Sequence, residues 1–492
     1  MSDSDINILR KKIALSGLGQ LISKFGIIIL SIFTLKYSTN ILGADLYGQY
    51  AVVISYVSIF LLFTDLGLSS ITSRELSKHP ENSERILGNS FSLRSAISII
   101  LIPIVIVLGF LLYNEKTESI KFGIALMAIT LLFSALQSTA STIFTSRTRS
   151  DIPAYINLLN KLTYLLSILA VGALGLGFYG FIYASIFAAI ISTIVSIVWS
   201  SKLVKIKLRY EIRSWKNIVI VALPLGIIQI VNVIYYKIDT LMLSIFRSAD
   251  EVGAYFIAYG VIDIAMSIPS MLMLSLMPTM STARSLKKLI KITEKAFYLM
   301  LLLSLPLTVF GAIISSHIIL FISSPQFISA AQPLSILLIG CIFSYLNYVF
   351  GFAAVSINKQ AKMLKVSLAT IAINIMLNLY FIPHYGITGA ATATFITEII
   401  ALIAIYNVFK NETGFKINFL KIWKPIFSIA VTAPIGLLIT NVINLNIITA
   451  LLMSCALVLM YGIILAVLKA YPEDVLVLAK IFVHKAKSMI RT

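Results

Sequence analysis

Apolar segments long enough to cross a bilayer recur along the whole chain. A membrane-spanning helix needs about 20 apolar residues to cross about 30 Å of hydrocarbon. We count about fourteen such segments, centred near residues 24, 59, 100, 132, 165, 189, 230, 264, 307, 343, 372, 398, 432 and 457. The polar gaps between them reach only about 15 residues, too few for a separate soluble domain. Strands of a membrane barrel would alternate over about ten residues, so the pattern predicts an all-α integral membrane protein.

Composition and charge support this prediction. The chain has 492 residues, of which 59% are hydrophobic and 12% charged. On the fourteen-span map, 31 of the 39 Lys and Arg residues fall on one side, four on the other and four within spans. Because Lys and Arg collect on the cytoplasmic side, both termini should be cytoplasmic. The net charge of +19 then reflects topology, and we expect no nucleic-acid partner.

The sequence predicts neither cleavage of the first apolar segment nor a disulfide between the cysteines. The segment follows Arg10, Lys11 and Lys12, exceeds the length of a signal-peptide core and lacks a small-residue cleavage site, so we expect it to be retained. Cys341 and Cys455 lie within predicted spans and cannot form a disulfide framework. We expect them to be inert packing residues.

Two local patterns occur twice. "ADLYGQY" at 44–50 returns as "ADEVGAY" at 249–255, and "GFYGFIYA" at 177–184 returns as "GITGAATA" at 386–393. The nearly constant offset predicts two six-helix lobes in parallel orientation, related by a pseudo-twofold axis along the membrane normal.

The repeat divides the chain into four parts. They are an N-lobe (1–205), a C-lobe (206–410), two additional spans (411–470) and a basic amphipathic cytoplasmic tail (471–492). The tail has the pattern of an interfacial helix, and a frayed terminus remains an equal alternative.

Three runs carry a resemblance to a known family. They are "YYKIDTLMLSIFRSADEVGAYFIAYGVIDI", "LGADLYGQYAVVISYVSIFLLFTDLGLSSITSREL" and "GITGAATATF". Together with the 6+6+2 layout they resemble the O-antigen and capsule polysaccharide flippases of the multidrug/oligosaccharidyl-lipid/polysaccharide (MOP) exporter superfamily, whose fold resembles that of the multidrug (MATE) exporters. The resemblance implies a protein of the cell (inner) membrane with two bundles that alternately open inward and outward and move undecaprenyl-pyrophosphate-linked oligosaccharide from the inner to the outer leaflet. Membrane lipids, a polysaccharide polymerase and a chain-length regulator are the expected partners of a monomer.

Polar side chains inside the spans are the candidate substrate contacts. A charge at the bilayer centre costs about 2.5–3.5 kcal/mol, so a retained charge should face a water-filled cavity or a partner. The 205-residue offset relates the polar face around Lys24 to one that includes Asp239. The predicted cavity residues are Gln20, Lys24, Ser31, Asn157, Lys161, Gln229, Asn232, Tyr236 and Asp239. For Lys24 the alternative is a hydrogen-bonded helix seam; for Lys161 it is snorkelling, and the role of Lys237 stays open.

Further charges suggest a gate and an ion-coupling site. Asp65 and Arg94 lie at similar depth, and we predict a salt bridge that braces the cytoplasmic gate, with substrate contact as the alternative. Glu398 and Asp263 lie near the centres of their spans and are candidates for coupling to H⁺ or Na⁺. The alternative for both is a protonated carboxyl bonded to a neighbouring helix.

Other function classes lack their motifs. The chain has no G-x-x-x-x-G-K, no H-E-x-x-H and no Cys/His cluster, which argues against an ATP-driven pump, a metalloenzyme and any cofactor. A secondary transporter, not an enzyme, is the expectation. The alternatives are a lipid II flippase, a multidrug exporter or a membrane glycan polymerase, although the short outer loops disfavour the last.

Overall fold

The fold is built from helices. The computed structural model describes residues 3–114, 116–283, 285–443 and 445–470, and within these the side chains of 3–15, 224, 225, 228, 232 and 236 are not described. The described residues form helices and their connections, with no strand among them. The predicted all-α class is therefore confirmed. The tail predicted for 471–492 lies outside the described residues.

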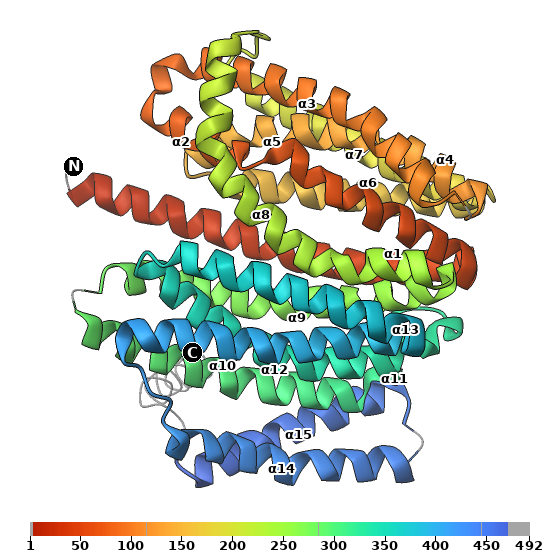
Figure 1. The fold of residues 1–492 in the computed structure, drawn as a ribbon, viewed down its shortest axis with the longest axis vertical. Coiled ribbons are helices and arrows are strands. Elements are labelled where there is room, and N and C mark those ends of the chain that lie inside the picture. The colour runs from red at the N-terminus through yellow and green to blue at the C-terminus, as the bar shows by residue number, and fades with distance from the viewer. Residues whose placement is uncertain (1–2, 115, 284, 444, 471–492) are drawn as a thin grey trace, which may run out of the picture. The chain divides into compact units, whose positions relative to one another are not determined.

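The chain divides into two compact units. Unit 1 comprises Met1–Ile257, Ile322–Ile328 and Asn378–Ile387. Its helices are α1 (Asp3–Asp65), α2 (Leu68–Lys78), the short 3-10 helix η1 (Pro80–Asn82), α3 (Ser83–Leu112), α4 (Glu118–Met127), α5 (Thr130–Ser146), α6 (Asp151–Ala173), α7 (Gly177–Ser201), α8 (Ile212–Phe246) and the beginning of α9 (Ala249–Ser281). Helix α6 packs against α1 and α7, and α5 packs against α3 and α7 (Figure 1).

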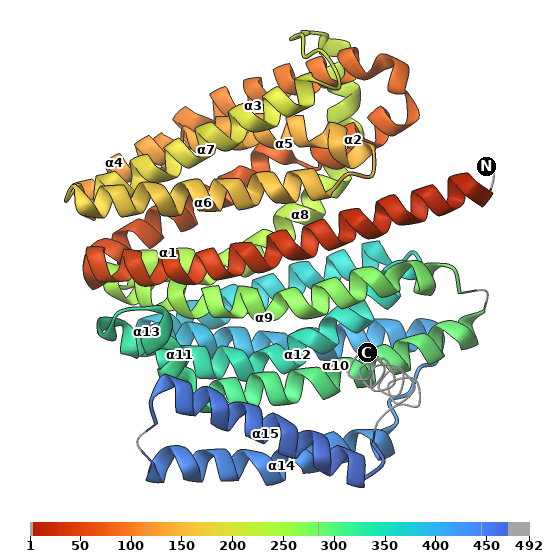
Figure 2. The same ribbon diagram turned by 180° about the vertical axis from the view of Figure 1, so that it is seen from behind.

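Unit 2 contains Ala258–Phe321, Ser329–Leu377 and Thr388–Thr492. Besides most of α9 it holds α10 (Leu286–Ile313), α11 (Ser315–Ile322), the end of the 3-10 helix η2 (Pro325–Ala330), α12 (Ala331–Ser356), most of α13 (Gln360–Thr413), α14 (Phe419–Val442) and α15 (Ile447–Val467). Helix α10 packs against α12 and α14, and α14 lies beside α15 in both ribbon views (Figures 1 and 2). Asn side chains cap the first turns of α14 and α15, which satisfies backbone N–H groups at these ends.

Two helices turn back on themselves at glycines. Helix α1 has 63 residues, or about 95 Å at 1.5 Å per residue, several times the thickness of a hydrocarbon core. It is interrupted at Gly43 (φ 67°, ψ −175°), and α13 is interrupted at Gly386 (φ 57°, ψ −135°). Glycine adopts positive φ without the Cβ penalty of other residues. Each of these helices therefore supplies two membrane crossings (Figure 1).

The helices are long and apolar enough for a multi-pass membrane protein. Eleven helical segments of the described chain meet the length and hydropathy of a membrane span, and two of them contain the turning points of α1 and α13. Helix α8 adds a further 35 helical residues. This arrangement is compatible with the predicted fourteen spans. Many large apolar side chains on the helix surfaces are exposed, such as Ile100 at 63% and Leu111 at 71%, as lipid-facing residues are.

The sequence repeats correspond to repeated backbone features. Gly177 and Gly386, the first residues of the second repeated pattern, have φ of 54° and 57°. Gly48 and Gly253, which are equivalent in the first pattern, meet each other within unit 1, because a Cβ added to Gly253 would lie 2.9 Å from Gly48 Cα. A Cβ on Gly48 would overlap the carbonyl of Ala249. Only glycine permits the two backbones to approach this closely.

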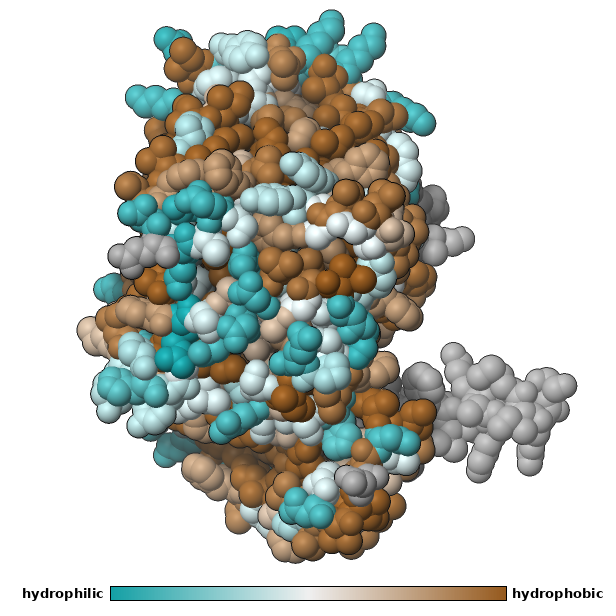
Figure 3. All heavy atoms as spheres, turned by 90° about the vertical axis from the view of Figure 1, so that its right-hand side faces the viewer, coloured by the Kyte–Doolittle hydropathy of each residue, from teal (hydrophilic) through white to brown (hydrophobic). Residues whose placement is uncertain are grey.

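A buried apolar cluster holds α3, α5 and α6 together. Leu87, Phe91, Ile143, Phe144 and Ile156 are among its buried members. On the face that Figure 3 shows, hydrophobic side chains are widespread, with hydrophilic side chains in several places among them. Both cysteine thiols are free; Cys341 is buried as expected, whereas Cys455 on α15 is exposed.

Candidate functional site

A polar stripe runs along α5. In "SALQSTASTIFT", residues 134–145, six of the seven polar positions fall at i, i+3, i+4, i+7, i+8 and i+11, which is one face of an α-helix. They are Ser134, Gln137, Ser138, Ser141, Thr142 and Thr145. Thr139, Ala140 and Ile143 are buried on the other side of the helix. The packed side fixes the helix, so the stripe has a defined direction.

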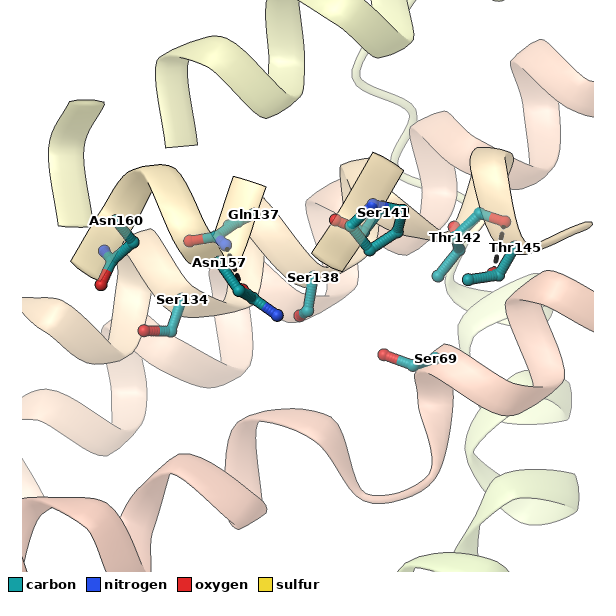
Figure 4. Close-up of a pocket in the computed structure, with 10 residues that line it drawn as sticks. Ser69, Ser134, Gln137, Ser138, Ser141, Thr142, Thr145, Asn157 and Asn160 are labelled. Atoms are coloured by element: carbon teal, nitrogen blue, oxygen red, sulfur yellow. Dashed lines mark hydrogen bonds between the residues drawn. The ribbon is translucent and has the colours of Figure 1, made fainter. Parts of the chain in front are cut away.

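The stripe lines a cavity of about 500 Å³ within unit 1. Helix α6 contributes Pro153, Asn157 and Asn160, and α2 contributes Ser69, whose hydroxyl points into the space below the stripe (Figure 4). The volume is in the range of small-molecule sites, about 300–1,000 Å³. Nine of the ten lining side chains can form hydrogen bonds, and none of the ten is charged.

Gln137 connects the walls of the cavity. Its Nε2 donates to Asn157 Oδ1 at 3.2 Å, and its Oε1 accepts from Ser192 Oγ at 2.9 Å. Asn160 Nδ2 also donates to Ser192 Oγ, at 3.0 Å. These bonds tie α5, α6 and α7 together and hold the amides in place. The resulting surface offers hydroxyl and amide groups that both donate and accept, which matches the hydroxyl groups of a sugar.

Ser69 links the cavity to a buried ion pair. Arg94 Nη2 lies 2.9 Å from Asp65 Oδ1, and the Arg94 side chain is only 2% exposed. Ser69 Oγ donates to Asp65 Oδ1 at 2.5 Å and lies 2.9 Å from Arg94 Nη1, which donates to it. Arg94 Nε also donates to the Thr64 carbonyl at 3.2 Å. The predicted partners are thus paired at the break between α1 and α2, where Leu66 has φ of 45°; their role in a gate stays a prediction.

The residues predicted on α1 and α6 fall in different surroundings. Asn157 lines the cavity and Lys24 and Ser31 are half-buried on α1. Gln20 is exposed, and its amide donates to the Ser16 carbonyl at 3.3 Å. Lys161 is half-buried, with Nζ 5.7 Å from the ring centroid of Tyr164, a cation–π contact. The structure therefore joins Asn157 to a larger neutral site that the sequence analysis missed, although the α5 spacing was visible in the sequence.

The residues predicted on α8 are partly described. The side chains of Asn232 and Tyr236 lie outside the described part of the chain, and Gln229 is half-buried. Asp239 is 1% exposed and accepts hydrogen bonds from Tyr255 Oη at 3.1 Å and Asn378 Nδ2 at 2.6 Å. Its carboxylate is therefore enclosed by neighbouring helices, whereas we expected it to line an open cavity.

The two coupling candidates in unit 2 differ in burial. Glu398 is 7% exposed, and its Oε2 accepts from Asn347 Nδ2 of α12 at 2.8 Å. Asp263 on α9 is exposed, and its role in coupling stays a prediction. Nearby on α13, Asn374 is buried and donates to Thr397 Oγ1 at 3.4 Å. Within the described part of the chain, no three His, Cys, Asp or Glu residues gather as metal ligands would.

Gly226 lies at a close crossing of helices. Helix α8 is continuous through it, and a Cβ at this position would lie 2.5 Å from the Leu66 carbonyl oxygen. Gly226 therefore allows α8 to cross the break between α1 and α2 closely.

Comparisons with known proteins match this architecture. A family model described as "polysaccharide biosynthesis protein" matches residues 9–284, and the MatE model matches residues 224–380. The chain is similar to a probable low-salt glycan biosynthesis flippase, Agl15, of Haloferax volcanii, with 22% identity over 363 residues, 72% of this chain and 74% of that protein. A proposed O-antigen transporter of Shigella flexneri is 22% identical over 378 residues, 74% of this chain and 89% of that protein.

Solved structures share the fold. The lipid II flippase MurJ, in an inward closed conformation, has a TM-score of 0.73 at 16% identity and covers 92% of this chain and 99% of its own. An inward-facing multidrug resistance MATE family transporter of the MOP superfamily has a TM-score of 0.64 at 14% identity, with 80% and 98% covered. The predicted MATE-like fold is therefore confirmed.

Proposed function

Because the chain belongs to the polysaccharide biosynthesis protein family, we propose that it is a flippase that carries polyprenyl-linked oligosaccharide across the cell membrane. The observation that supports this most directly is the neutral cavity of unit 1, whose hydroxyl and amide groups suit sugar hydroxyls. Relatives named as a glycan biosynthesis flippase and an O-antigen transporter support the same substrate class. A transporter of this kind moves its substrate without chemical change, so the protein is not an enzyme.

The proposed cycle is alternating access between the two leaflets. The lipid-linked sugar enters from the cytoplasmic leaflet, and both termini are cytoplasmic, as the distribution of Lys and Arg predicts. The sugar binds the polar stripe of α5 and Asn157 of α6, while Lys24 and Lys161 attract the pyrophosphate as compact point charges. Glu398 is our leading candidate for coupling to a gradient of H⁺ or Na⁺, since it is a buried carboxyl inside a membrane helix. We further propose that the protein acts as a monomer and delivers the transported oligosaccharide to a polymerase and a chain-length regulator.

Lipid II flipping is the second candidate. It is favoured by one observation, the TM-score of 0.73 with MurJ over almost the whole chain. At 16% identity this likeness concerns the fold, and many chemistries share one fold. The matching family model favours a polysaccharide substrate.

Complementation in two bacterial strains distinguishes the candidates. One strain lacks its own polysaccharide flippase and the other lacks its lipid II flippase, and the chain is expressed in each. We expect surface polysaccharide to return in the first strain, together with the appearance of lipid-linked oligosaccharide in the outer leaflet. Rescue of viability in the second strain alone would replace our proposal with lipid II flipping. Rescue of neither strain, with the protein shown to be inserted, would contradict both.

A further inference from the structure

A second, positively charged pocket lies at one end of unit 1. It has a volume of about 820 Å³ and is lined by residues from α1, the ends of α5 and α7, and the beginning of α6. Its lining shares no residue with that of the neutral cavity. On α6, Asp151, Ile152 and Tyr155 belong to this pocket, whereas Pro153, Asn157 and Asn160 belong to the neutral cavity. Residues two positions apart point about 200° apart on a helix, so the two sites use opposite faces of α6.

The pocket has a net excess of positive charge. Arg147, Arg149 and Lys202 supply three cations, and Asp151 supplies one carboxylate. Arg149 is bound to Asp151, with Nη2 2.9 Å from Oδ2, and the Asp151 backbone N–H donates to Ser16 Oγ at 3.2 Å. Asp151 is therefore occupied by Arg149 and by its place at the start of α6. The exposed Arg147 and Lys202 remain as the charges that a ligand would meet.

The same pocket has an aromatic and apolar wall. Tyr155 is 39% exposed and Trp199 is 41% exposed, and Leu203 beside them is 41% exposed. The tyrosine is seated where α1 passes close to α6, because a Cβ at Gly19 would come within 2.7 Å of its hydroxyl. Tyrosine and tryptophan are enriched at the membrane–water boundary, where one end of the ring is apolar and the other is wet.

From these observations we infer that the pocket binds the phosphate headgroup of an acidic phospholipid of the surrounding bilayer, with the acyl chains against Tyr155, Trp199 and Leu203. Cations beside an apolar aromatic wall match an amphiphile with an anionic head. The pocket also lies at the end of the helices that the Lys and Arg distribution predicts to be cytoplasmic. The position on the face of α6 opposite the neutral cavity favours a bilayer lipid over the transported sugar-lipid.

The fluorescence of Trp199 can show which lipid occupies the pocket. The chain has three tryptophans, and replacing Trp215 and Trp423 by phenylalanine leaves Trp199 as the single fluorophore. This protein is reconstituted in phosphatidylcholine vesicles that contain brominated phosphatidylglycerol or brominated phosphatidylcholine at equal fractions. Each cation near the membrane surface strengthens acidic-lipid binding roughly fivefold, so two cations together predict a preference on the order of 25-fold for phosphatidylglycerol in the quenching of Trp199.

Two double variants distinguish a specific lipid-binding pocket from a general effect of surface charge. The double variant Arg147→Gln/Lys202→Gln should lose the preference. The matched control Lys78→Gln/Lys205→Gln, which removes two exposed cations that are not among the pocket residues, should retain it. Equal quenching by the two brominated lipids, or a preference that survives in the pocket variant, would overturn the inference.

Competition identifies the source of the phosphate. Unbrominated polyprenyl pyrophosphate at a few mole per cent should leave the quenching by brominated phosphatidylglycerol unchanged. If it relieves the quenching, the pocket binds the transported lipid, and the inference that a bilayer phospholipid occupies it is wrong. Inorganic phosphate in the buffer should also have no effect on the quenching. Relief of quenching by phosphate would indicate a site for a soluble anion and would contradict the inference.

If the single-tryptophan protein does not fold, native mass spectrometry of the unmodified chain and its Arg147→Gln/Lys202→Gln variant gives the same comparison of bound lipids. Equal retention of phosphatidylglycerol by the two would contradict the inference, independently of any flippase assay.

Discussion

Gln137 is the residue through which the neutral cavity is most easily tested. Its amide bonds both Asn157 and Ser192, and leucine has nearly the same volume without these groups. We expect Gln137→Leu to lower export of lipid-linked oligosaccharide by about tenfold, because a lost sugar contact together with an unpaired neighbour costs roughly 1–3 kcal/mol. The measurement is the rate of substrate appearance in the outer leaflet at equal amounts of inserted protein.

A matched control lies on the same helix. Thr139→Val replaces a hydroxyl that is fully buried on another face of α5 and bonded to the Ala135 carbonyl. This variant should export normally. Loss of export in both variants to the same degree would attribute the Gln137 effect to helix packing and contradict a substrate contact.

Lys24 tests the proposed attraction of the pyrophosphate. We expect Lys24→Ala to abolish export while the protein remains inserted, and Lys24→Arg to restore a large part of it because the positive charge returns. The readout is surface polysaccharide in cells that carry only the variant. Normal polysaccharide with Lys24→Ala would remove Lys24 from the proposed site.

The pair of Arg94 and Asp65 has a predicted cost for stability. Removing one partner of a buried ion pair typically costs about 3–5 kcal/mol, since the remaining charge is left uncompensated. Arg94→Met should therefore lower the thermal unfolding temperature of the purified protein markedly. Arg94→Met/Asp65→Asn should lower it less than the sum of the single variants, because neutralising Asp65 removes the stranded charge. Strictly additive losses would show that the pair contributes no coupling.

At the scale of helices, close backbone approach is the testable feature. A methyl group on Gly48 would overlap the Ala249 carbonyl, so Gly48→Ala should destabilise the protein by about 1–3 kcal/mol, as overpacking does. Gly17 on the same helix has no atom within 4 Å of an added Cβ, and Gly17→Ala should be neutral or stabilising, since alanine favours helix by up to about 1 kcal/mol. Thermal unfolding in detergent compares the two. Equal effects would contradict the contact between the two repeats.

The elements themselves were predictable from sequence to different degrees. Hydropathy locates the spans because membrane helices satisfy all their backbone groups internally and so follow the apolar pattern closely. The repeats at Gly48 and Gly253 and at Gly177 and Gly386 were visible as motifs, and the backbone explains them by close approach and positive φ. The α5 stripe has a clear helical spacing, but we overlooked it because it contains no charge.

Side-chain partners were much harder to anticipate. Position along a helix does not say which neighbour covers a face, so Asp239 was expected to line a cavity and is instead enclosed by Tyr255 and Asn378. The Asn378 contact joins residues 139 apart in sequence. Asp65 and Arg94 were easier to pair, since both lie at the same depth of adjacent spans and an isolated buried arginine is too costly.

At the scale of the whole chain, the topology that the distribution of Lys and Arg predicts can be tested directly. After Cys341→Ala and Cys455→Ala, a single cysteine at the exposed Thr117 should react with a membrane-impermeant maleimide added to intact cells. A cysteine at the exposed Lys205 should react only after the membrane is opened. The opposite pattern would invert the proposed orientation and, with it, the direction of transport.

The neutral lining of the unit 1 cavity has a kinetic consequence. Each sugar hydroxyl that binds there replaces a water molecule with a bond of similar strength, so the net gain per contact is small. We expect such a site to hold its cargo weakly and to release it quickly. We therefore expect throughput to be set by the rate at which the helices rearrange, and oligosaccharides of different sugar composition to be carried at comparable speed.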